Sequence, residues 1–576
     1  MVPVSGGDTG VRLVADVAHV VVLMLENRSF DHLLGYVQHP DPEAFDGLLG
    51  AGPFTNPDRA AGTVAASPSA KQVLPAGPDH SHDAVMQQLA LAAGKPTNQG
   101  FVRSYERKCR GLDPVRFGGL LGPVVNWVHD LSSSRHAVTG RGPLAMACQP
   151  PEHVPVLARL ACEFAVCTRW FCSVPGETWP NRNFVHAATS DGDTVNQTRP
   201  YTNPTIFELL EKHGADWRIY FDDTPQVWAF PALWDTADRH EKWFPLDRFT
   251  EHAARGDLPA YTFIEPNHRP PLHTLDHDPV IGTPDLSNNQ HPENNLVSNA
   301  AYDAFTLHGE SDFTRAEQLI AAVYEALRAN PELFDQTLLL VTYDEHGGLY
   351  DHVPPPTGVP SPGGGTSGVK TVQRALLYRK SAEFDFTLLG PRVPAIVISP
   401  RVPAGTIDNQ PRDHASVPAT LRALFAPGAQ PLTARDRWSP PFHHLLTLPE
   451  PRTDLPDLSG HATPIVAAVS EPLAALAPAA EAAAPTTEAA APTTEAAPAP
   501  QAAPAAAAGP PSVPAYYQPY MALADRVQQH LVAVGEPEAI AAPPTGPPID
   551  RSAQISQTFA EAAHRHRHPD EAAPSS

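Results

Sequence analysis

The sequence predicts an α/β domain with a largely parallel sheet, and two apolar runs carry that prediction. Residues 20–25 are six apolar residues in a row, and residues 338–341 form a second run. Both runs are continuous rather than alternating, which is typical of strands buried on both faces of a parallel sheet. Segments with helical periodicity lie between the strand-like runs, and this alternation indicates helices that cover a sheet.

Further elements are expected along the chain. We predict strands over 261–266 and 394–400, and helices over 83–94, 205–214 and 314–330. The last helix is expected to begin at Thr314, with Glu317 three residues later completing a capping box. The stretch 358–369 is rich in glycine but lacks the Gly-Lys-Ser/Thr ending of a phosphate-binding loop, so we expect a mobile loop or lid there.

Composition divides the chain into four regions. Residues 1–16 are an N-terminal lead-in, 17–460 a globular catalytic domain, 461–515 a linker and 516–576 a tail. The linker consists mainly of Ala, Pro, Thr and Glu, which bury too little apolar surface to become ordered. In the tail, residues 519–535 have apolar side chains at helical spacing, which predicts one short amphipathic helix. This helix either docks on the domain or on a partner, or it is a weakly formed helix in a mostly disordered tail. The final HRHRHPDEAAPSS is expected to be a solvated terminus.

Composition also limits the classes of partner. The chain has 63 Asp and Glu against 40 Lys and Arg and no basic tract, so we expect no nucleic-acid binding and no attraction to an anionic membrane. It has no uncharged apolar run of about 18 residues, so no transmembrane segment is expected. No signal peptide is visible, which predicts a cytoplasmic protein as written, or a secreted one if the N-terminus is incomplete. The five cysteines predict buried thiols or a single disulfide rather than a zinc cluster.

Polar clusters follow both apolar runs. Glu26 and Asn27 come directly after the first run, and Asp344 and Glu345 follow the second. Because ligands gather outside the carboxyl ends of parallel strands, we expect these side chains to meet at one edge of the sheet. Such oxygen donors suit magnesium, calcium or manganese, and nearby imidazoles bring zinc or iron into contention. The sequence therefore predicts a divalent metal site, with the alternative that Glu26 and Asn27 only cap a helix near Ser29.

A third segment, SVPGETWPNRNF at 173–184, is expected to be a loop because of its prolines and glycine. Its Thr178 hydroxyl is a poor nucleophile unless it is activated, and coordination to a metal is one means of activation. Asn181 and Arg182 are suited to hold the non-bridging oxygens of a phosphate, the arginine with two parallel hydrogen bonds. The alternative is an ordinary proline-rich surface loop.

Histidines accompany these segments. His80 and His291 would suit protonation of a leaving oxygen or a hydrogen bond to a phosphoryl oxygen. His346 and His352 follow the second polar cluster, on either side of two glycines, and His414 follows an aspartate that could orient its ring. These three are candidates for substrate or phosphate contacts. With 27 histidines in the chain, most must be incidental.

Taken together and in this order, ENRSFDH, GETWPNR, NNQHPE, DEHGGLYDHVPPP and RDHAS resemble the bacterial phosphoesterase family over about residues 17–425. That family includes phospholipases C that act on phosphatidylcholine and broad-specificity acid phosphatases. The resemblance implies an alkaline phosphatase-like three-layer α/β sandwich with a mixed, mostly parallel sheet. It also implies that Glu26, Asn27, Asp344 and Glu345 surround a divalent metal or a phosphate, and that Thr178 is the nucleophile.

The resemblance further implies that His80 and His291 contact phosphate or assist the leaving group. The expected activity is hydrolysis of a phosphoester, of the phospholipase C type, with a phospholipid among the candidate substrates. A phosphomonoesterase and a catalytically degraded binding protein of the same fold are the alternatives. Glu177 departs from the family pattern, in which proline is usual. Nearby aromatic side chains either line an approach for acyl chains or belong to the core: Trp170, Phe171, Trp179 and Phe184.

Overall fold

The computed structural model describes residues 17–50, 52–111, 139–268, 287–297, 299–304, 311–363, 381–465, 517–534 and 548–567, with a few isolated positions between these ranges. The predicted lead-in, nearly all of the predicted linker and the second half of the stretch 358–369 lie outside the described residues.

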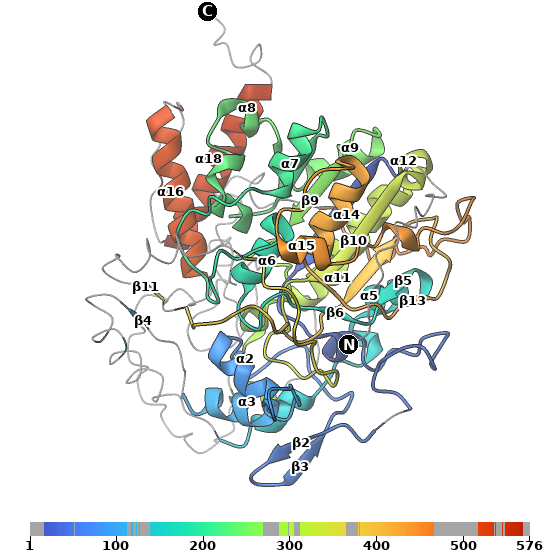
Figure 1. Ribbon diagram of the computed structural model, residues 1–576, viewed down its shortest axis with the longest axis vertical. Helices are drawn as coiled ribbons and strands as arrows, with labels where there is room; N and C mark the ends of the chain where they lie inside the picture. The colour runs from blue at the N-terminus through green and yellow to red at the C-terminus, as the bar shows by residue number, and fades with distance from the viewer. Residues whose placement is uncertain are drawn as a thin grey trace, which may run out of the picture.

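A mixed sheet of eight strands forms the centre of the fold (Figure 1). Its order is β13 (Thr406–Asp408), β5 (Ala165–Cys167), β12 (Ala395–Ile398), β10 (Thr337–Tyr343), β1 (His19–Leu25), β9 (Tyr261–Glu265), β7 (Trp217–Phe221) and β8 (Trp243–Pro245). Neighbouring strands of this sheet are parallel except where β12 pairs with β10 and with β5. The predicted mixed, mostly parallel sheet is therefore confirmed. The continuous apolar runs are its central strands, and residues 20–25 are fully buried.

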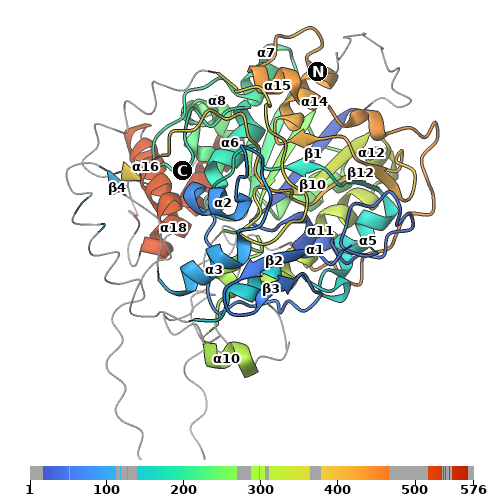
Figure 2. The ribbon, with the colours of Figure 1, turned by 60° about the horizontal axis from the view of Figure 1, so that its bottom comes forward.

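Helices cover both faces of the sheet, so the predicted three layers are present. One layer contains α5 (Pro155–Glu163), α9 (Arg248–Ala254), α11 (Asp312–Arg328) and α12 (Pro331–Asp335), and the other contains α6 (Thr178–Ala187), α7 (Ile206–Lys212), α14 (Ser416–Phe425) and α15 (Ala434–Trp438). Figure 2 shows α5 and α11 on one side of β1 and β10, with α14 and α15 on the other.

Smaller elements surround these layers. They are α1 (Phe30–Leu34), β2 (Thr55–Asp58), β3 (Gly62–Ala65), α2 (His82–Leu89), α3 (Phe101–Cys109), β4 (Phe117–Gly118), β6 (Trp170–Phe171), α8 (Ala237–His240), α10 (Asn299–Ala304), β11 (Tyr378–Arg379) and β14 (Arg412–Asp413). The helix predicted over 83–94 is α2, which stops earlier because Ala90 adopts the left-handed conformation. The helix predicted over 205–214 is α7, with a capping box between Thr205 and Glu208.

The last predicted helix of the domain is α11, but its start was predicted wrongly. Its N-cap is Ser311, whose hydroxyl accepts a hydrogen bond from the N–H of Thr314, so Thr314 and Glu317 form no capping box. The Glu317 carboxylate is buried instead and accepts hydrogen bonds from the backbone N–H groups of Val156 (2.8 Å) and Leu157 (3.2 Å) at the start of α5. Burial disfavours the charged form and raises the pKa of Glu317 to about 7.

We expect the Glu317→Gln variant to lose part of the pH dependence of stability. The pKa of about 7 in the folded state lies above the ordinary value of 4.5, so the folded state binds this proton more tightly than the unfolded state. The resulting stabilisation is fully present below pH 4.5 and is lost as the pH rises through 7, by up to about 3 kcal/mol. In urea unfolding between pH 4 and 8, the free energy of unfolding of the variant should increase relative to that of the wild type as the pH rises. A pH-independent difference, like that expected for the exposed Glu332→Gln control, would contradict this assignment.

The C-terminal tail contains two helices. The predicted amphipathic helix is α16 (Gln518–Val534), which buries Leu523, Val527 and Leu531 in the main core. A second helix, α18 (Pro548–Arg567), was not predicted, and the HRHR segment expected to be a solvated terminus forms its last turn. Figure 1 shows α16 and α18 side by side, with α18 against α8. The tail therefore belongs to the same packed body as the catalytic domain.

All five cysteines lie in the described ranges and none of them forms a disulfide. Four are buried, and Cys162 is half-buried. Of the two alternatives drawn from the sequence, buried thiols are therefore correct.

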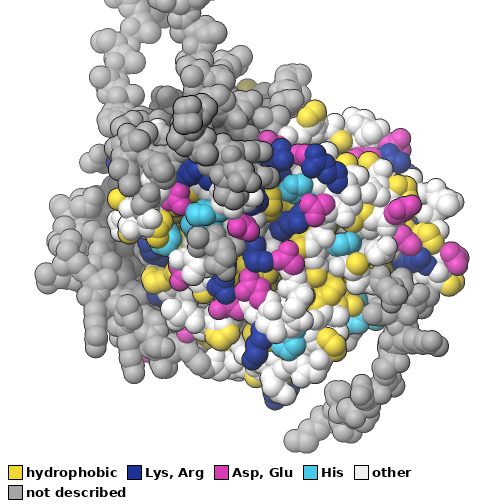
Figure 3. Space-filling model, turned by 90° about the horizontal axis from the view of Figure 1, so that it is seen from above, with side chains coloured by type: hydrophobic (Ala, Val, Ile, Leu, Met, Phe, Trp, Pro, Cys, Tyr) yellow, Lys and Arg dark blue, Asp and Glu magenta, His cyan; other side chains and the backbone are white. Residues whose placement is uncertain are grey.

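Two further observations concern the helices and one face of the surface. Within the described ranges, none of the helices combines the length and the apolar character needed to cross a bilayer. On the face shown in Figure 3, the described basic and acidic side chains are interspersed rather than gathered into a patch of one sign.

Candidate active site

The two predicted strand-to-loop junctions lie side by side because β1 and β10 are parallel neighbours. The backbone N–H of Asn27 donates to Asp344 Oδ1 at 3.0 Å and joins the junctions directly. Asn27 has a φ of +58°, in the left-handed region. Gly347 has a φ of +66°, and a Cβ there would lie 2.1 Å from the Asn27 carbonyl oxygen. Only glycine permits this close approach, which explains the glycine that follows the DEH sequence.

The residues of the first junction do not cap the helix that follows them. The N-cap of α1 is Ser29, whose hydroxyl oxygen accepts from the backbone N–H of His32 at 3.1 Å. The expectation of a helix near Ser29 is therefore correct, but Glu26 and Asn27 do not cap it.

Thr178 begins a helix, although its segment was predicted to be a loop. It is the first residue of α6, and Pro180 lies within the first turn, where the missing N–H of proline costs nothing. The Thr178 hydroxyl donates to Asn27 Oδ1 at 3.4 Å, and the residue is 4% exposed. The structure thus brings the predicted nucleophile to the two junctions.

Asn181 holds the turn at residues 174–178. Its Oδ1 accepts from the N–H of Val174 at 2.9 Å, and its Nδ2 donates to the carbonyl oxygens of Val174, Gly176 and Glu177 at 3.0–3.3 Å. Because the backbone occupies both ends of the amide, the side chain has no free group for a phosphate in this arrangement, and the expected contact stays a prediction. The side chain instead fixes the turn that presents Thr178.

Arg182 is buried among carboxylates. Its guanidinium lies 2.6 Å from Glu265 Oε2, 3.5 Å from Glu26 Oε1 and 3.7 Å from Asp344 Oδ2, and all four side chains are fully buried. Arg182 is thus paired with protein carboxylates, and its expected bidentate contact with a phosphate stays a prediction. Burial raises the pKa of both Glu26 and Asp344, and the positive charge of Arg182 opposes that rise.

His80 and Glu345 form a second polar pair. His80 Nδ1 lies 3.9 Å from Glu345 Oε1, and His346 Nδ1 lies 3.3 Å from Glu345 Oε2. Burial raises the pKa of Glu345 to about 8. Burial lowers the pKa of His80, but Glu345 and other nearby carboxylates outweigh it, so that pKa is raised. The ring of His291 lies 5.5 Å from that of His80, and burial holds the pKa of His291 well below the ordinary value.

Two other candidate histidines have structural contacts. His414 Nε2 donates to the Asp344 carbonyl oxygen at 2.5 Å, and its Nδ1 accepts from Trp170 Nε1 at 3.1 Å. His352 lies 2.7 Å from Asp31, whose charge outweighs burial and raises the pKa of His352 to about 9. Both rings thus have protein partners in this arrangement, and their expected contacts with substrate stay predictions.

Glu26 has neighbours that the sequence did not identify. Tyr520 Oη donates to Glu26 Oε1 at 3.0 Å, His268 Nε2 lies 3.4 Å from the same oxygen, and Asn289 Nδ2 donates to Oε2 at 3.3 Å. Tyr520 also stacks on His268, with ring centroids 4.8 Å apart, and meets Trp179 edge-on. The tail helix α16 therefore places an aromatic side chain directly on the candidate site.

One of the missed residues did have a sequence signal. Glu265 is the last residue of β9, the parallel neighbour of β1. The rule that identified Glu26 at the end of its strand applies equally to Glu265. Tyr520 has no such signal because it lies 494 residues from its partner.

The carboxylate and amide oxygens at this edge of the sheet are of the chemical type that binds a divalent cation. Within the described chain, Asp344 Oδ2 and Glu345 Oε1 are buried and accept no hydrogen bond. Buried carboxylate oxygens are costly unless positive charge compensates them. The carboxylates of Glu26, Asp344 and Glu345 are not among the described groups whose ligand atoms all lie within 4.8 Å of one another. The predicted ligands therefore share one edge, but in this arrangement their carboxylates do not converge that closely.

Comparison with known proteins identifies the family of the chain. Residues 17–426 match the Phosphoesterase family. The chain is 32% identical to non-specific phospholipase C3 of Arabidopsis thaliana, over 78% of this chain and 77% of the relative. It is 28% identical to phospholipase C B of Mycobacterium tuberculosis, over 73% and 75%, so the matching relatives are plant as well as bacterial.

Among solved structures, a protein of the alkaline phosphatase superfamily from Vibrio parahaemolyticus is 13% identical over 50% of this chain and 64% of that chain, with a TM-score of 0.27. The family match spans both strand-to-loop junctions and the Thr178 segment. The chain belongs to the phosphoesterase family, whose members hydrolyse phosphoester bonds.

Proposed function

We propose that the protein is a phospholipase C-like hydrolase whose nucleophile is Thr178. The observation that carries the proposal is the position of the Thr178 hydroxyl at the start of α6, against Asn27 Oδ1, where β1 and β10 end. The N-terminus of a helix favours a negatively charged group, so a phosphoryl group is suited to lie there. A divalent cation held by Asn27, Glu26 and Asp344 would lower the pKa of the threonine hydroxyl and neutralise charge on the phosphoryl oxygens.

His80 and solvent water can carry the proton transfers. Thr178 Oγ1 attacks phosphorus as its proton passes to solvent water. The bond between phosphorus and the leaving oxygen breaks, and His80 donates a proton to that oxygen. Water then attacks the phosphothreonine, His80 takes a proton from the water, and Thr178 regains its own. Positioning and charge neutralisation contribute most, because phosphoryl transfer needs little covalent chemistry from the protein.

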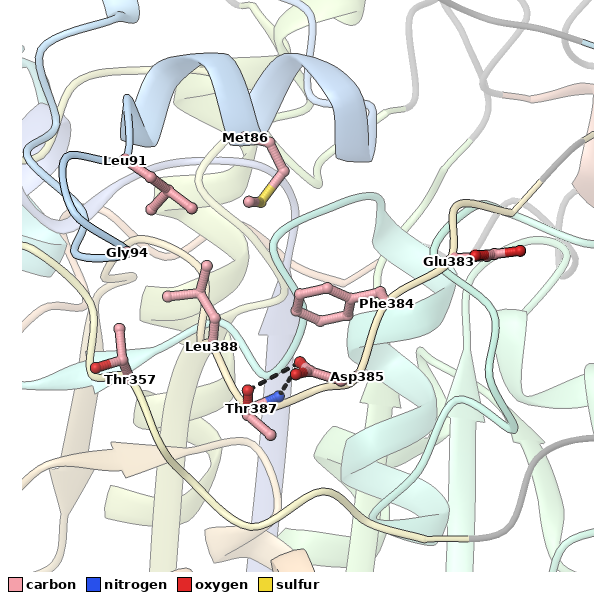
Figure 4. Close-up of a pocket in the computed structure, with 9 residues that line it drawn as sticks. All are labelled: Met86, Leu91, Gly94, Thr357, Glu383, Phe384, Asp385, Thr387 and Leu388. Atoms are coloured by element: carbon pink, nitrogen blue, oxygen red, sulfur yellow. Dashed lines mark hydrogen bonds between the residues drawn. The ribbon is translucent and has the colours of Figure 1, made fainter.

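A partly apolar hollow beside the site favours a lipid substrate. The hollow has a volume of about 620 Å³, and its apolar lining is Met86, Leu91, Phe384 and Leu388, while Glu383, Asp385, Thr357, Thr387 and Gly94 complete it (Figure 4). It is close to the turn at 174–178, because His82 Nδ1 lies 2.7 Å from the Pro175 carbonyl oxygen while the same ring contacts Phe384. Acyl chains need an apolar surface of this kind, whereas a small phosphomonoester does not.

The aromatic residues that were alternative candidates for this role belong to the core. Each of them is at most 1% exposed: Trp170, Phe171, Trp179 and Phe184. The lipid proposal therefore rests on the hollow beside α2.

A comparison of two substrates tests the proposed function. Purified protein with added divalent metal ions should release diacylglycerol from phosphatidylcholine faster than it releases phosphate from p-nitrophenyl phosphate. Activity on the monoester alone would favour the acid phosphatase alternative. Turnover of neither substrate would favour a degraded binding protein.

We expect Leu91→Glu to lower phosphatidylcholine hydrolysis at least tenfold and to leave turnover of a water-soluble phosphodiester nearly unchanged. Leu91 is 43% exposed at the hollow, so the substitution should not disturb the core, but its charge would face the acyl chains. Leu49→Glu is a matched control, because Leu49 is similarly exposed but lines different hollows. Equal losses on both substrates would contradict a role for this hollow in lipid binding.

A further inference from the structure

The tail brings a second group of potential metal ligands against the catalytic domain. His240 ends α8, Glu536 follows α16, and His566 lies in the last turn of α18. One potential ligand atom from each of these residues lies within 4.8 Å of the other two. The group thus joins three stretches of chain, two of which come from the tail.

His240 is held in the way that metal-binding histidines are held. Its Nε2 lies 2.7 Å from the Trp234 carbonyl oxygen, which can only accept, so Nε2 carries the proton. With the proton on Nε2, the neutral imidazole presents a lone pair at Nδ1. Among the described residues, this buried Nδ1 has no hydrogen-bond partner. A carbonyl that fixes the tautomer while the other nitrogen stays free is typical of a histidine that binds a metal.

Glu536 directs a carboxylate oxygen at the same point. Arg565 binds its Oε2 at 2.5 Å, which leaves Oε1 facing His566 Nε2 at 2.9 Å. The ring of His566 lies 5.3 Å from that of His240. Beside them, in the described part of the chain, the buried Nε2 of His530 also has no hydrogen-bond partner. An ion pair between Glu536 and His566 satisfies neither free imidazole nitrogen, whereas a cation would be bound by such lone pairs.

We propose that His240, Glu536 and His566 bind a divalent transition metal of the zinc class, separate from the candidate active site. Two imidazole nitrogens and one carboxylate oxygen form a donor set that zinc prefers, and His530 lies beside the remaining position. The metal would cross-link α8 to both tail helices. Because Tyr520 is in the first turn of α16, this clamp would also hold Tyr520 against Glu26.

Zinc binding by the full chain tests the proposal. After treatment with a chelator and dialysis against Zn²⁺, the wild type should retain one more equivalent of zinc than His566→Gln. The matched control is His564→Gln, an exposed histidine two residues away in the same helix, which should retain as much zinc as the wild type. The Asp344→Asn variant should keep the equivalent that His566→Gln loses, because that variant changes only the candidate active site. Equal zinc content in His566→Gln and wild type would overturn the proposal.

Proteolysis provides a second readout that does not depend on activity. Added Zn²⁺ should slow the proteolytic release of the tail helices at least tenfold in the wild type and in His564→Gln, but not in His566→Gln. His240→Gln changes the ligand on the catalytic domain and should give the same loss of protection. If added Zn²⁺ does not slow the proteolytic release of the tail helices from the wild type, the proposal is also overturned.

Discussion

Replacing Thr178 with alanine should lower turnover of a phosphoester on the order of 10⁴-fold or more, because it removes the atom that would attack phosphorus. The same change should cost only about 1 kcal/mol of stability, since the hydroxyl donates one long hydrogen bond, of 3.4 Å, to Asn27. Steady-state rates measured with saturating metal, together with circular dichroism of the folded chain, would show both effects.

Two controls make this result specific. Thr178→Ser retains a hydroxyl and should restore much of the activity, while the exposed Thr202→Ala should behave like the wild type. Near-wild-type turnover by the alanine variant would rule out Thr178 as the nucleophile and leave the family membership intact.

Replacing Arg182 with glutamine should destabilise the fold by about 3–5 kcal/mol. The guanidinium is fully buried and lies within 4 Å of carboxylates from Glu265, Glu26 and Asp344. Its removal leaves these buried charges without compensation, so they must take up protons or water. The destabilisation should therefore be smaller at low pH, where burial already favours the protonated forms of Glu26 and Asp344. Urea unfolding at pH 5 and pH 8 would measure it.

An exposed arginine provides the comparison. Arg248 is half exposed and pairs with Glu251 on the surface, so Arg248→Gln should cost at most about 1 kcal/mol. Adding Glu265→Gln to Arg182→Gln should recover part of the lost stability, because it removes one of the unpaired charges. An Arg182→Gln variant as stable as Arg248→Gln would show that this buried network contributes nothing.

The features that could be predicted from sequence follow from local patterns. Continuous apolar runs identified β1 and β10, and the rule for parallel strands then placed Glu26 and Asp344 at one edge. Thr178 was identified by the motifs around it, but its helix was missed. Pro180 was interpreted as a helix breaker, although proline is tolerated in the first turn of a helix.

Several candidate phosphate contacts have protein partners that the sequence did not reveal. Asn181, Arg182, His352 and His414 are the kinds of residue that bind phosphate, and sequence alone does not show which protein groups they already contact. In the fold, backbone amides and carbonyls occupy Asn181, and buried carboxylates engage Arg182. The contact between Tyr520 and Glu26 depends on packing of the whole tail, which no local pattern records.

The contact between Tyr520 and Glu26 means that the candidate site is completed late in the synthesis of the chain. Glu26 leaves the ribosome early, whereas its hydrogen-bond donor Tyr520 is made 494 residues later. A nascent or prematurely terminated chain that ends before residue 517 contains every strand of the sheet and Thr178, yet it lacks the hydroxyl that binds Glu26 and the ring that packs on Trp179. The site is therefore complete only after synthesis has passed residue 520 and α16 has folded onto the domain.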